Sequence, residues 1–239
     1  GISANDAAIQ VKNKALKLAS ILLEKPEDEL ELSDGAVRAR SDSNQFITLA
    51  DLALQLSPAV AGKLPEGFET AGLEAVSYQT TDYMPHSSGA NIAKVEVDVV
   101  TGGIKILDYY VVHDCGRILN PMIVDGQIIG GVVHGIGNAM FEQMVYDDSG
   151  NPMTTNYGDY LLPLASEMPE IHVAHIETPS PANPMGLKGA GEGGTIPAIG
   201  AMINAIEDAL TPFDAYIAKY PVTPEYILEL VDGEKMAAE

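Results

Sequence analysis

A glycine-rich segment near the end of the chain restricts the fold more than any other part of the sequence. Residues 186–194 read Gly-Leu-Lys-Gly-Ala-Gly-Glu-Gly-Gly, and several prolines come just before them. Glycines at this density predict a loop, because glycine adopts positive φ angles and lets the backbone approach a ligand closely. The next segment, Ile196–Leu210, has apolar residues at helical spacing and predicts a helix. We therefore expect Glu192 on a bare loop at a helix N-terminus, where free N–H groups favour anions.

Two nucleotide-binding patterns and one simpler interpretation compete for this loop. Gly189, Gly191 and Gly194 match the dinucleotide pattern GxGxxG. That pattern requires a tight strand-to-helix turn and an acidic residue about 20 positions later at a strand end. Here prolines precede the loop, and Asp208 falls inside the predicted helix. A phosphate-binding P-loop fits less well, since the full glycine loop does not precede Lys188. A solvated glutamate on a flexible surface loop stays open on composition alone.

Charge, hydropathy and cysteine content exclude several classes of protein. The 239 residues carry a formal net charge of -21, which excludes nucleic acid and anionic membranes as partners. No apolar run reaches the roughly 18 residues of a membrane span, and no signal peptide is visible, so we expect a cytoplasmic chain without a membrane span. Cys115 is the only cysteine. His113, Asp114 and Cys115 are adjacent, but neighbours on a strand point to opposite faces, so we expect no metal site there.

Periodicity along the chain predicts an α+β fold with two lobes, residues 1–66 and 67–239. We expect mixed β-sheets with helices packed on them. Ser3 and Asp6 resemble a capping box at the start of the first helix, and Gly233 is expected to end the last one. Strand-like residues with tight-turn signals predict two hairpins. The expected helices span 6–25, 48–56, 121–144, 196–210 and 223–233, and the expected strands lie within 30–40, 92–112 and 170–176.

Several motifs together resemble the large molybdopterin-binding subunits of the xanthine oxidase family. The run Pro179–Thr195 is similar to the signature near the C-terminus of those subunits. Val111–Pro121 and the glycine-rich stretch 126–137 resemble the family's strand end, Asn-Pro turn and helix beside the pterin. The hairpin at 95–102 and the closing Pro221–Glu225 also fit, so the resemblance covers nearly the whole chain. The Asn-Pro-x-Gly form ahead of the loop is closest to the carbon-monoxide-dehydrogenase-like and aldehyde oxidoreductase branch.

The resemblance implies a molybdenum hydroxylase subunit whose two lobes are parts of one molybdopterin-binding domain. Such enzymes hydroxylate an aldehyde or an aromatic N-heterocycle with oxygen from water, and Glu192 matches their general base. Their molybdenum is held by the pterin rather than by side chains, and we expect the cofactor as a dinucleotide. At one position where the family commonly has Gln, this chain has His134. The residues expected at the cofactor are Ser3, Gln127, Gly131, His134, Gly135, Lys188, Gly189 and Gly191.

Simpler roles remain open for several of these residues. Gly131 and Gly135 suit helix packing equally well, Ser3 suits a helix cap, and Lys188 suits an ordinary surface position.

The same resemblance implies partners on other chains. The family's subunit has a further N-terminal half that binds the pterin and is absent from this sequence, so we expect a second chain to supply it. We also expect a [2Fe-2S] subunit, an FAD subunit and a small-molecule substrate. Two alternatives stay open: a carbon monoxide dehydrogenase-type subunit, and a non-catalytic structural partner in such a complex. The intact loop with Glu192 argues against the second.

Overall fold

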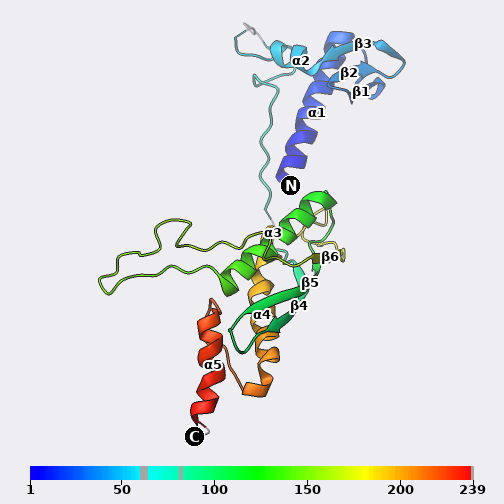
Figure 1. The fold of residues 1–239 in the computed structure, drawn as a ribbon. Coiled ribbons are helices and arrows are strands. Elements are labelled where there is room, and N and C mark those ends of the chain that lie inside the picture. Colours follow the sequence, from blue (N-terminus) through cyan, green and yellow to red (C-terminus); the bar gives the residue numbers. More distant parts are fainter. Residues whose placement is uncertain (60–63, 81–82, 238–239) are drawn as a thin grey trace. The chain divides into compact units, whose positions relative to one another are not determined.

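The computed structural model describes residues 1–59, 64–80 and 83–237, which form two compact units, Gly1–Thr81 and Asp82–Glu239 (Figure 1). Helices and two three-stranded sheets make up this described part, so the α+β prediction is confirmed. Phe68 and Leu73 pack against the hydrophobic core of the first unit, which carries that unit past residue 66. The division of a single cofactor-binding domain into the lobes 1–66 and 67–239 stays a prediction.

The first unit packs two helices against a small antiparallel sheet. Its core contains the fully buried Leu18, Leu30 and Leu52. Asp34 and Gly35 have φ angles of 47° and 71° and form the predicted tight turn between the first two strands. The elements are α1 (Ile2–Leu23), a 3-10 turn (Glu27–Glu29), β1 (Leu30–Ser33), β2 (Ala36–Ala39), β3 (Asp42–Thr48) and α2 (Leu49–Gln55).

The first unit differs from the prediction at the start of α1 and at strand β3. Helix α1 begins at Ile2 with Gly1 at its N-cap and no side-chain cap, so the capping box predicted at Ser3 is wrong. Ser3 instead lies within the first helical turn. Strand β3 was not predicted, because its exposed polar residues lack a clear apolar alternation. The predicted short helix is confirmed as α2, where the Thr48 side chain accepts a hydrogen bond from the Asp51 N–H at 3.1 Å.

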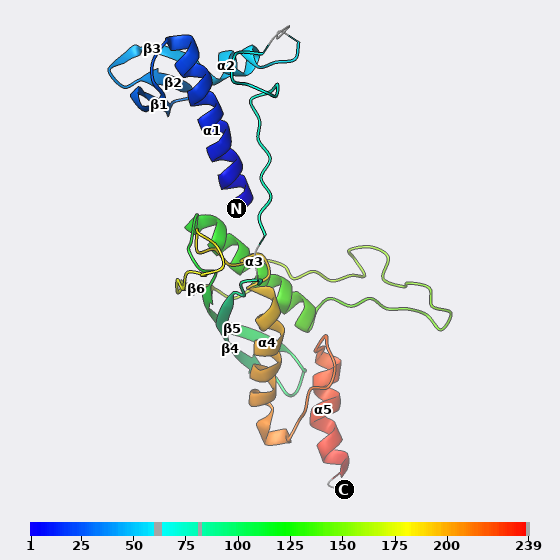
Figure 2. The same ribbon diagram turned by 180° about the vertical axis from the view of Figure 1, so that it is seen from behind.

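The second unit is a mixed sheet covered by helices, as Figures 1 and 2 show from opposite sides. Its strands β4 and β5 form the predicted antiparallel hairpin, while β6 pairs with β5 in parallel. Tyr109, Ile128 and Met202 are fully buried and belong to the core between sheet and helices. The elements are β4 (Ser88–Val97), β5 (Ile104–Asp114), α3 (Pro121–Met140), β6 (Ile171–His175), α4 (Thr195–Ala209), a 3-10 turn (Thr211–Phe213) and α5 (Pro224–Ala237).

The end of the last helix differs from the prediction. Gly233 lies inside α5, which continues to Ala237, so the expected stop at Gly233 is wrong. Glycine is only a weak helix breaker, costing about 1 kcal/mol relative to alanine, and packing of the helix outweighs that cost. Ile227 and Val231 of α5 are buried in the core of the second unit.

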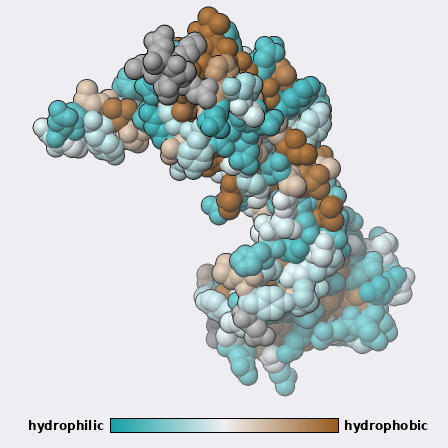
Figure 3. All heavy atoms as spheres, turned by 90° about the horizontal axis from the view of Figure 1, so that it is seen from below, coloured by the Kyte–Doolittle hydropathy of each residue, from teal (hydrophilic) through white to brown (hydrophobic). Residues whose placement is uncertain are grey.

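A long segment between α3 and β6 extends away from the rest of the second unit (Figures 1 and 2). Many of its large apolar side chains are exposed, among them Tyr157 at 80% and Leu164 at 62%. Figure 3 shows hydrophobic residues reaching the surface elsewhere as well. Among the described residues, no helix combines the length and the apolar character that crossing a membrane requires.

Helices α3 and α4 lie in close contact through glycines on α3. A Cβ atom added to Gly131 would lie 3.0 Å from the Gly194 Cα and from the Thr195 nitrogen. A Cβ atom added to Gly135 would lie 2.6 Å from the Cβ of Ala198. Real Cβ atoms do not approach so closely, because overpacking a dense interior forces backbone shifts. The glycines therefore set the distance between the two helices.

We predict that Gly135→Ala destabilises the protein by about 1–3 kcal/mol, since the added methyl must push α4 away from α3. Gly200→Ala on α4 is the matched control: a Cβ there meets nothing within 4 Å, and the helix should gain about 0.5–1 kcal/mol. Equilibrium urea unfolding measures both changes. Equal stability of the Gly135 variant and the unsubstituted chain would contradict the close contact.

Candidate active site

The predicted loop forms, and Glu192 lies at its end, immediately before α4. The Glu192 backbone carbonyl accepts hydrogen bonds from the N–H groups of Thr195 at 3.0 Å and Ile196 at 3.3 Å. Its side chain is exposed. Gly194 is the N-cap of α4 and provides no side-chain cap. The Glu192 backbone is thus tied to the first turn of α4, while its carboxylate is free to meet a ligand.

The start of the loop is fastened to the chain that follows β5. Gly116 and Leu187 form an antiparallel bridge, and the Lys188 N–H donates to the Cys115 carbonyl at 2.9 Å. Gly116 and Gly186 have φ angles of 69° and 70°, a region that favours glycine. A Cβ added to Gly116 would lie 2.2 Å from the Gly186 carbonyl oxygen. Glycine is therefore required at Gly116 for this close approach.

Lys188 and Asp114 form an ion pair at this bridge. The Lys188 Nζ lies 3.1 Å from an Asp114 carboxylate oxygen, and the side chains are only 13% and 11% exposed. Burial raises the pKa of Asp114, but hydrogen bonds from Thr178, Gly116 and Lys188 outweigh it and hold the pKa well below its ordinary value. Asp114 is therefore ionised and fixes the start of the loop, and Lys188 is not the ordinary surface lysine that its sequence allowed.

The end of the loop rests on His113 of β5. This side chain is 1% exposed, and a Cβ added to Gly193 would lie 2.2 Å from its Nε2 atom. Burial and the neighbouring His175 lower the pKa of His113, and Asp114 acts in the opposite direction. The sequence pattern gave no reason to expect a metal site at His113 and did not indicate its contact with the loop. Its register opposite His175 follows from the parallel pairing of β5 and β6, which no local pattern indicates.

The residues predicted on α3 lie on neighbouring strips of the helix, one exposed and one buried. Gly131 and Gly135 are buried against α4, which assigns them a packing role. Gln127 and His134 are exposed and two helical turns apart, so they share one face, which borders the buried glycines. Between them lies Gly130, where an added Cβ would meet nothing within 4 Å. This face offers polar side chains around an open strip of backbone and fits a polar cofactor at its surface.

The remaining predicted residues are divided between loop and first unit. Gly189 and Gly191 face open space, because a Cβ at either position would meet nothing within 4 Å. They fit the close approach of a cofactor to the loop backbone. Ser3 is half-buried on α1 in the first unit, and its predicted contact with the cofactor stays a prediction.

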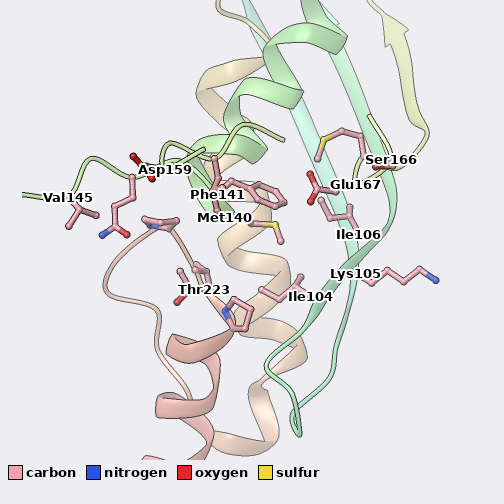
Figure 4. Close-up of a pocket in the computed structure, with 16 residues that line it drawn as sticks. Ile104, Lys105, Ile106, Met140, Phe141, Val145, Asp159, Ser166, Glu167 and Thr223 are labelled. Carbon is pink, nitrogen blue, oxygen red and sulfur yellow. The ribbon is translucent and has the colours of Figure 1, made fainter. Parts of the chain in front are cut away.

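A cavity of about 680 Å³ lies elsewhere in the second unit, at the C-terminal end of α3 (Figure 4). None of the residues predicted for the site lines it. The loop nevertheless remains the better candidate, since its bare glycines and exposed carboxylate match the expected chemistry. The cavity is lined mainly by side chains of β5, α3 and the turns before β6 and α5, including Ile104, Ile106, Met140, Phe141, Met168 and Val222.

We predict that Lys188→Met destabilises the protein by about 3 kcal/mol, because it leaves the Asp114 carboxylate buried without its cation. Lys94→Met removes an exposed pair, with Lys94 65% exposed and 3.7 Å from Asp108, and should cost less than about 1 kcal/mol. Urea unfolding of the two variants tests the difference. Similar small losses in both would show that the ion pair does not hold the loop.

We predict that the free energy of unfolding falls as the pH drops through about 6.5, the ordinary pKa of histidine. Below that pH the unfolded chain binds a proton at His113, whereas the folded chain, with its lowered pKa, does not. Stability therefore rises again as the pH increases. His113→Phe should reduce this pH dependence. His86 is exposed, so His86→Gln should leave the pH dependence unchanged. Thermal unfolding measured between pH 5 and 8 gives the slopes, and an unchanged slope in His113→Phe would contradict the assignment.

Comparisons with known proteins show the family to which the chain is related. Residues 1–169 match the family model described as the molybdopterin cofactor-binding domain. The nicotine 6-hydroxylase large subunit of Paenarthrobacter nicotinovorans is 40% identical over 96% of this chain and 28% of its own length. The carbon monoxide dehydrogenase large chain of Hydrogenophaga pseudoflava is 36% identical over 85% of this chain and 25% of its own length.

Solved structures show the same relationship. Quinoline 2-oxidoreductase from Pseudomonas putida 86 matches with a TM-score of 0.71 and 37% identity, covering 94% of this chain and 28% of that one. The chain thus spans less than a third of the length of these relatives. The family model covers well over half of the present sequence, and the resemblance inferred from its motifs is confirmed. The chain belongs to the molybdopterin cofactor-binding domain family.

Proposed function

We propose that this chain forms part of the molybdopterin-binding subunit of a molybdenum hydroxylase, with Glu192 as the general base. The observation that carries the proposal is the setting of Glu192. Its exposed carboxylate follows two glycines that face open space, while the backbone on either side of it is anchored. A functional group on a bare segment between rigid supports is well suited to meet a ligand in a defined geometry.

The cofactor proposed for this site is molybdenum bound to molybdopterin as a dinucleotide. Gln127 and His134 on the open face of α3 would hold its polar groups, and His134 would donate through its ring where relatives commonly have Gln. The backbone at Gly189 and Gly191 would pack against it. Ser3, on the first unit, would reach its phosphate. When bound, the cofactor supplies the two-electron oxidation of the substrate.

The role proposed for Glu192 is proton transfer. A carboxylate oxygen takes up the proton released as oxygen derived from water attacks an electron-poor carbon of the substrate. General base catalysis requires this oxygen within hydrogen-bond reach of the proton that it accepts. The anchored backbone on both sides limits the positions that the carboxylate can occupy, which favours such reach. Lys188, held by Asp114, acts on this loop as a support rather than as a ligand.

We propose an aromatic N-heterocycle or an aldehyde as the substrate. The named activities of the nicotine and quinoline enzymes favour the heterocycle. A carbon monoxide dehydrogenase-type subunit is the second candidate, favoured by the similarity to the large chain from Hydrogenophaga pseudoflava. This chain spans 28% of the nicotine enzyme's large subunit, which supports the proposal that another polypeptide segment contributes the rest of the site.

The partners proposed follow from the same comparison of lengths. A second molybdopterin-subunit segment would complete the cofactor site, and separate subunits with [2Fe-2S] clusters and FAD would carry the electrons away. The exposed apolar side chains of the segment between α3 and β6 support burial against another polypeptide. We expect this assembly in the cytoplasm.

We predict that Glu192→Gln lowers kcat by at least about 10²–10⁴-fold, because the amide has similar shape but cannot accept the proton. Molybdenum and pterin contents of the purified complex should not change, since the side chain is not proposed to hold the cofactor. Glu225→Gln, an exposed glutamate on α5, is the matched control and should keep the unsubstituted rate. A Glu192→Gln complex with full cofactor content and normal turnover would end the assignment.

A further inference from the structure

His113 is a buried polar side chain that lacks a hydrogen-bond partner among the described residues. It is 1% exposed, yet neither Nδ1 nor Nε2 is hydrogen-bonded within the described part of the chain. Buried polar atoms in native structures are nearly always paired, so an exception calls for an explanation. The proposed reaction does not use His113 directly. Its position relative to the loop indicates what the ring does there.

The ring of His113 lies directly against the backbone that follows Glu192. A Cβ atom added to Gly193 would lie 2.2 Å from Nε2 and 2.8 Å from Cδ2 of the ring. The next residue, Gly194, is equally close to α3, because a Cβ there would lie 2.3 Å from the Ile128 carbonyl oxygen. The backbone after Glu192 is thus held between the ring and a helix, whereas Gly191 before it faces open space.

Neighbouring groups hold the His113 ring in place. Its register partner His175 lies edge-on, with ring centroids 6.3 Å apart. The His175 Nε2 is itself paired with an Asp125 carboxylate oxygen at 2.6 Å. On its other side His113 pairs with Gly89 of β4, so it belongs to the central strand of the sheet. Strand pairing on both sides holds the His113 backbone, and the contacts with His175 and Gly193 restrict its ring.

We infer that His113 is the positioning residue for Glu192. Its ring packs against the Gly193 backbone and so sets the direction of the neighbouring Glu192 carboxylate. This inference rests on the proposed function, because it assigns a purpose to the position of Glu192. In this inference His113 acts through the loop backbone rather than by contact with substrate or cofactor. The support is one of shape, since the contact with Gly193 involves no hydrogen bond among those of the described residues.

The test is a double-substitution cycle in the complete, cofactor-loaded complex. Gly193→Ala presses a methyl group against the ring and should lower kcat about 10²-fold, the effect expected from a misplacement of about 1 Å, with little change in KM. His113→Ala removes the support and should also lower kcat. In the double variant, the methyl group of Ala at position 193 occupies the space that the His113 ring has left. Its kcat should therefore be about tenfold higher than that of Gly193→Ala alone. Gly200→Ala is the control and should keep the unsubstituted rate.

A second readout does not depend on turnover. Hydrogen exchange of the Thr195 and Ile196 amides, which donate to the Glu192 carbonyl, should become faster in His113→Ala and stay unchanged in Gly200→Ala. Exchange in the other elements of the second unit should change little, which separates positioning from general loss of stability. Equal acceleration throughout that unit would overturn the inference. Because this measurement uses only His113→Ala and Gly200→Ala, it tests the inference even if Gly193→Ala does not fold.

A third comparison distinguishes failure of this inference from failure of the proposed function. In a Glu192→Gln background, His113→Ala should cause no further loss of kcat, because groups that act as one unit are not additive. A full further loss would show that His113 acts independently of Glu192 and would overturn the inference. Normal turnover of Glu192→Gln alone would instead reject the proposed function, and the exchange data would then decide whether His113 still supports the loop.

Discussion

The close approach of α3 and α4 is the constraint on which the second unit depends. Gly131 and Gly135 add no side chain of their own, so the start of α4 lies close to the α3 backbone at these two positions. Glu192 comes just before that contact and accepts two hydrogen bonds from the first turn of α4. Any change in the distance between these helices is therefore transmitted to the loop and its carboxylate.

The loop itself combines two kinds of support with a bare middle. At its start, the ion pair of Lys188 and Asp114 joins it to the end of β5. At its end, the His113 ring and α3 enclose the backbone of Gly193 and Gly194. These supports differ in physical origin, since one is electrostatic and the other is steric. Between the supports, Gly189 and Gly191 leave the backbone open to a ligand.

The family assignment and the geometry constrain the function at different levels. Membership in the molybdopterin cofactor-binding domain family indicates the kind of cofactor, whereas the chemistry depends on a particular site. In the proposed site, Glu192 lies on the loop and polar side chains lie on the open face of α3. The exposed apolar side chains before β6 and the 28% span of the nicotine enzyme's large subunit are the two observations behind the proposal that another polypeptide completes the site.

The sequence alone determined the features that depend on neighbouring residues. Apolar periodicity predicted α3 and α4, turn residues predicted the β4–β5 hairpin, and the glycine pattern predicted the loop around Glu192. Only the tertiary structure decided that the His113 ring contacts Gly193, that Asp114 pairs with Lys188, and that α5 continues through Gly233. Propensities and turn chemistry act over a few residues, whereas these contacts join distant segments. Their formation depends on the packing free energy of the whole unit, which no local pattern expresses.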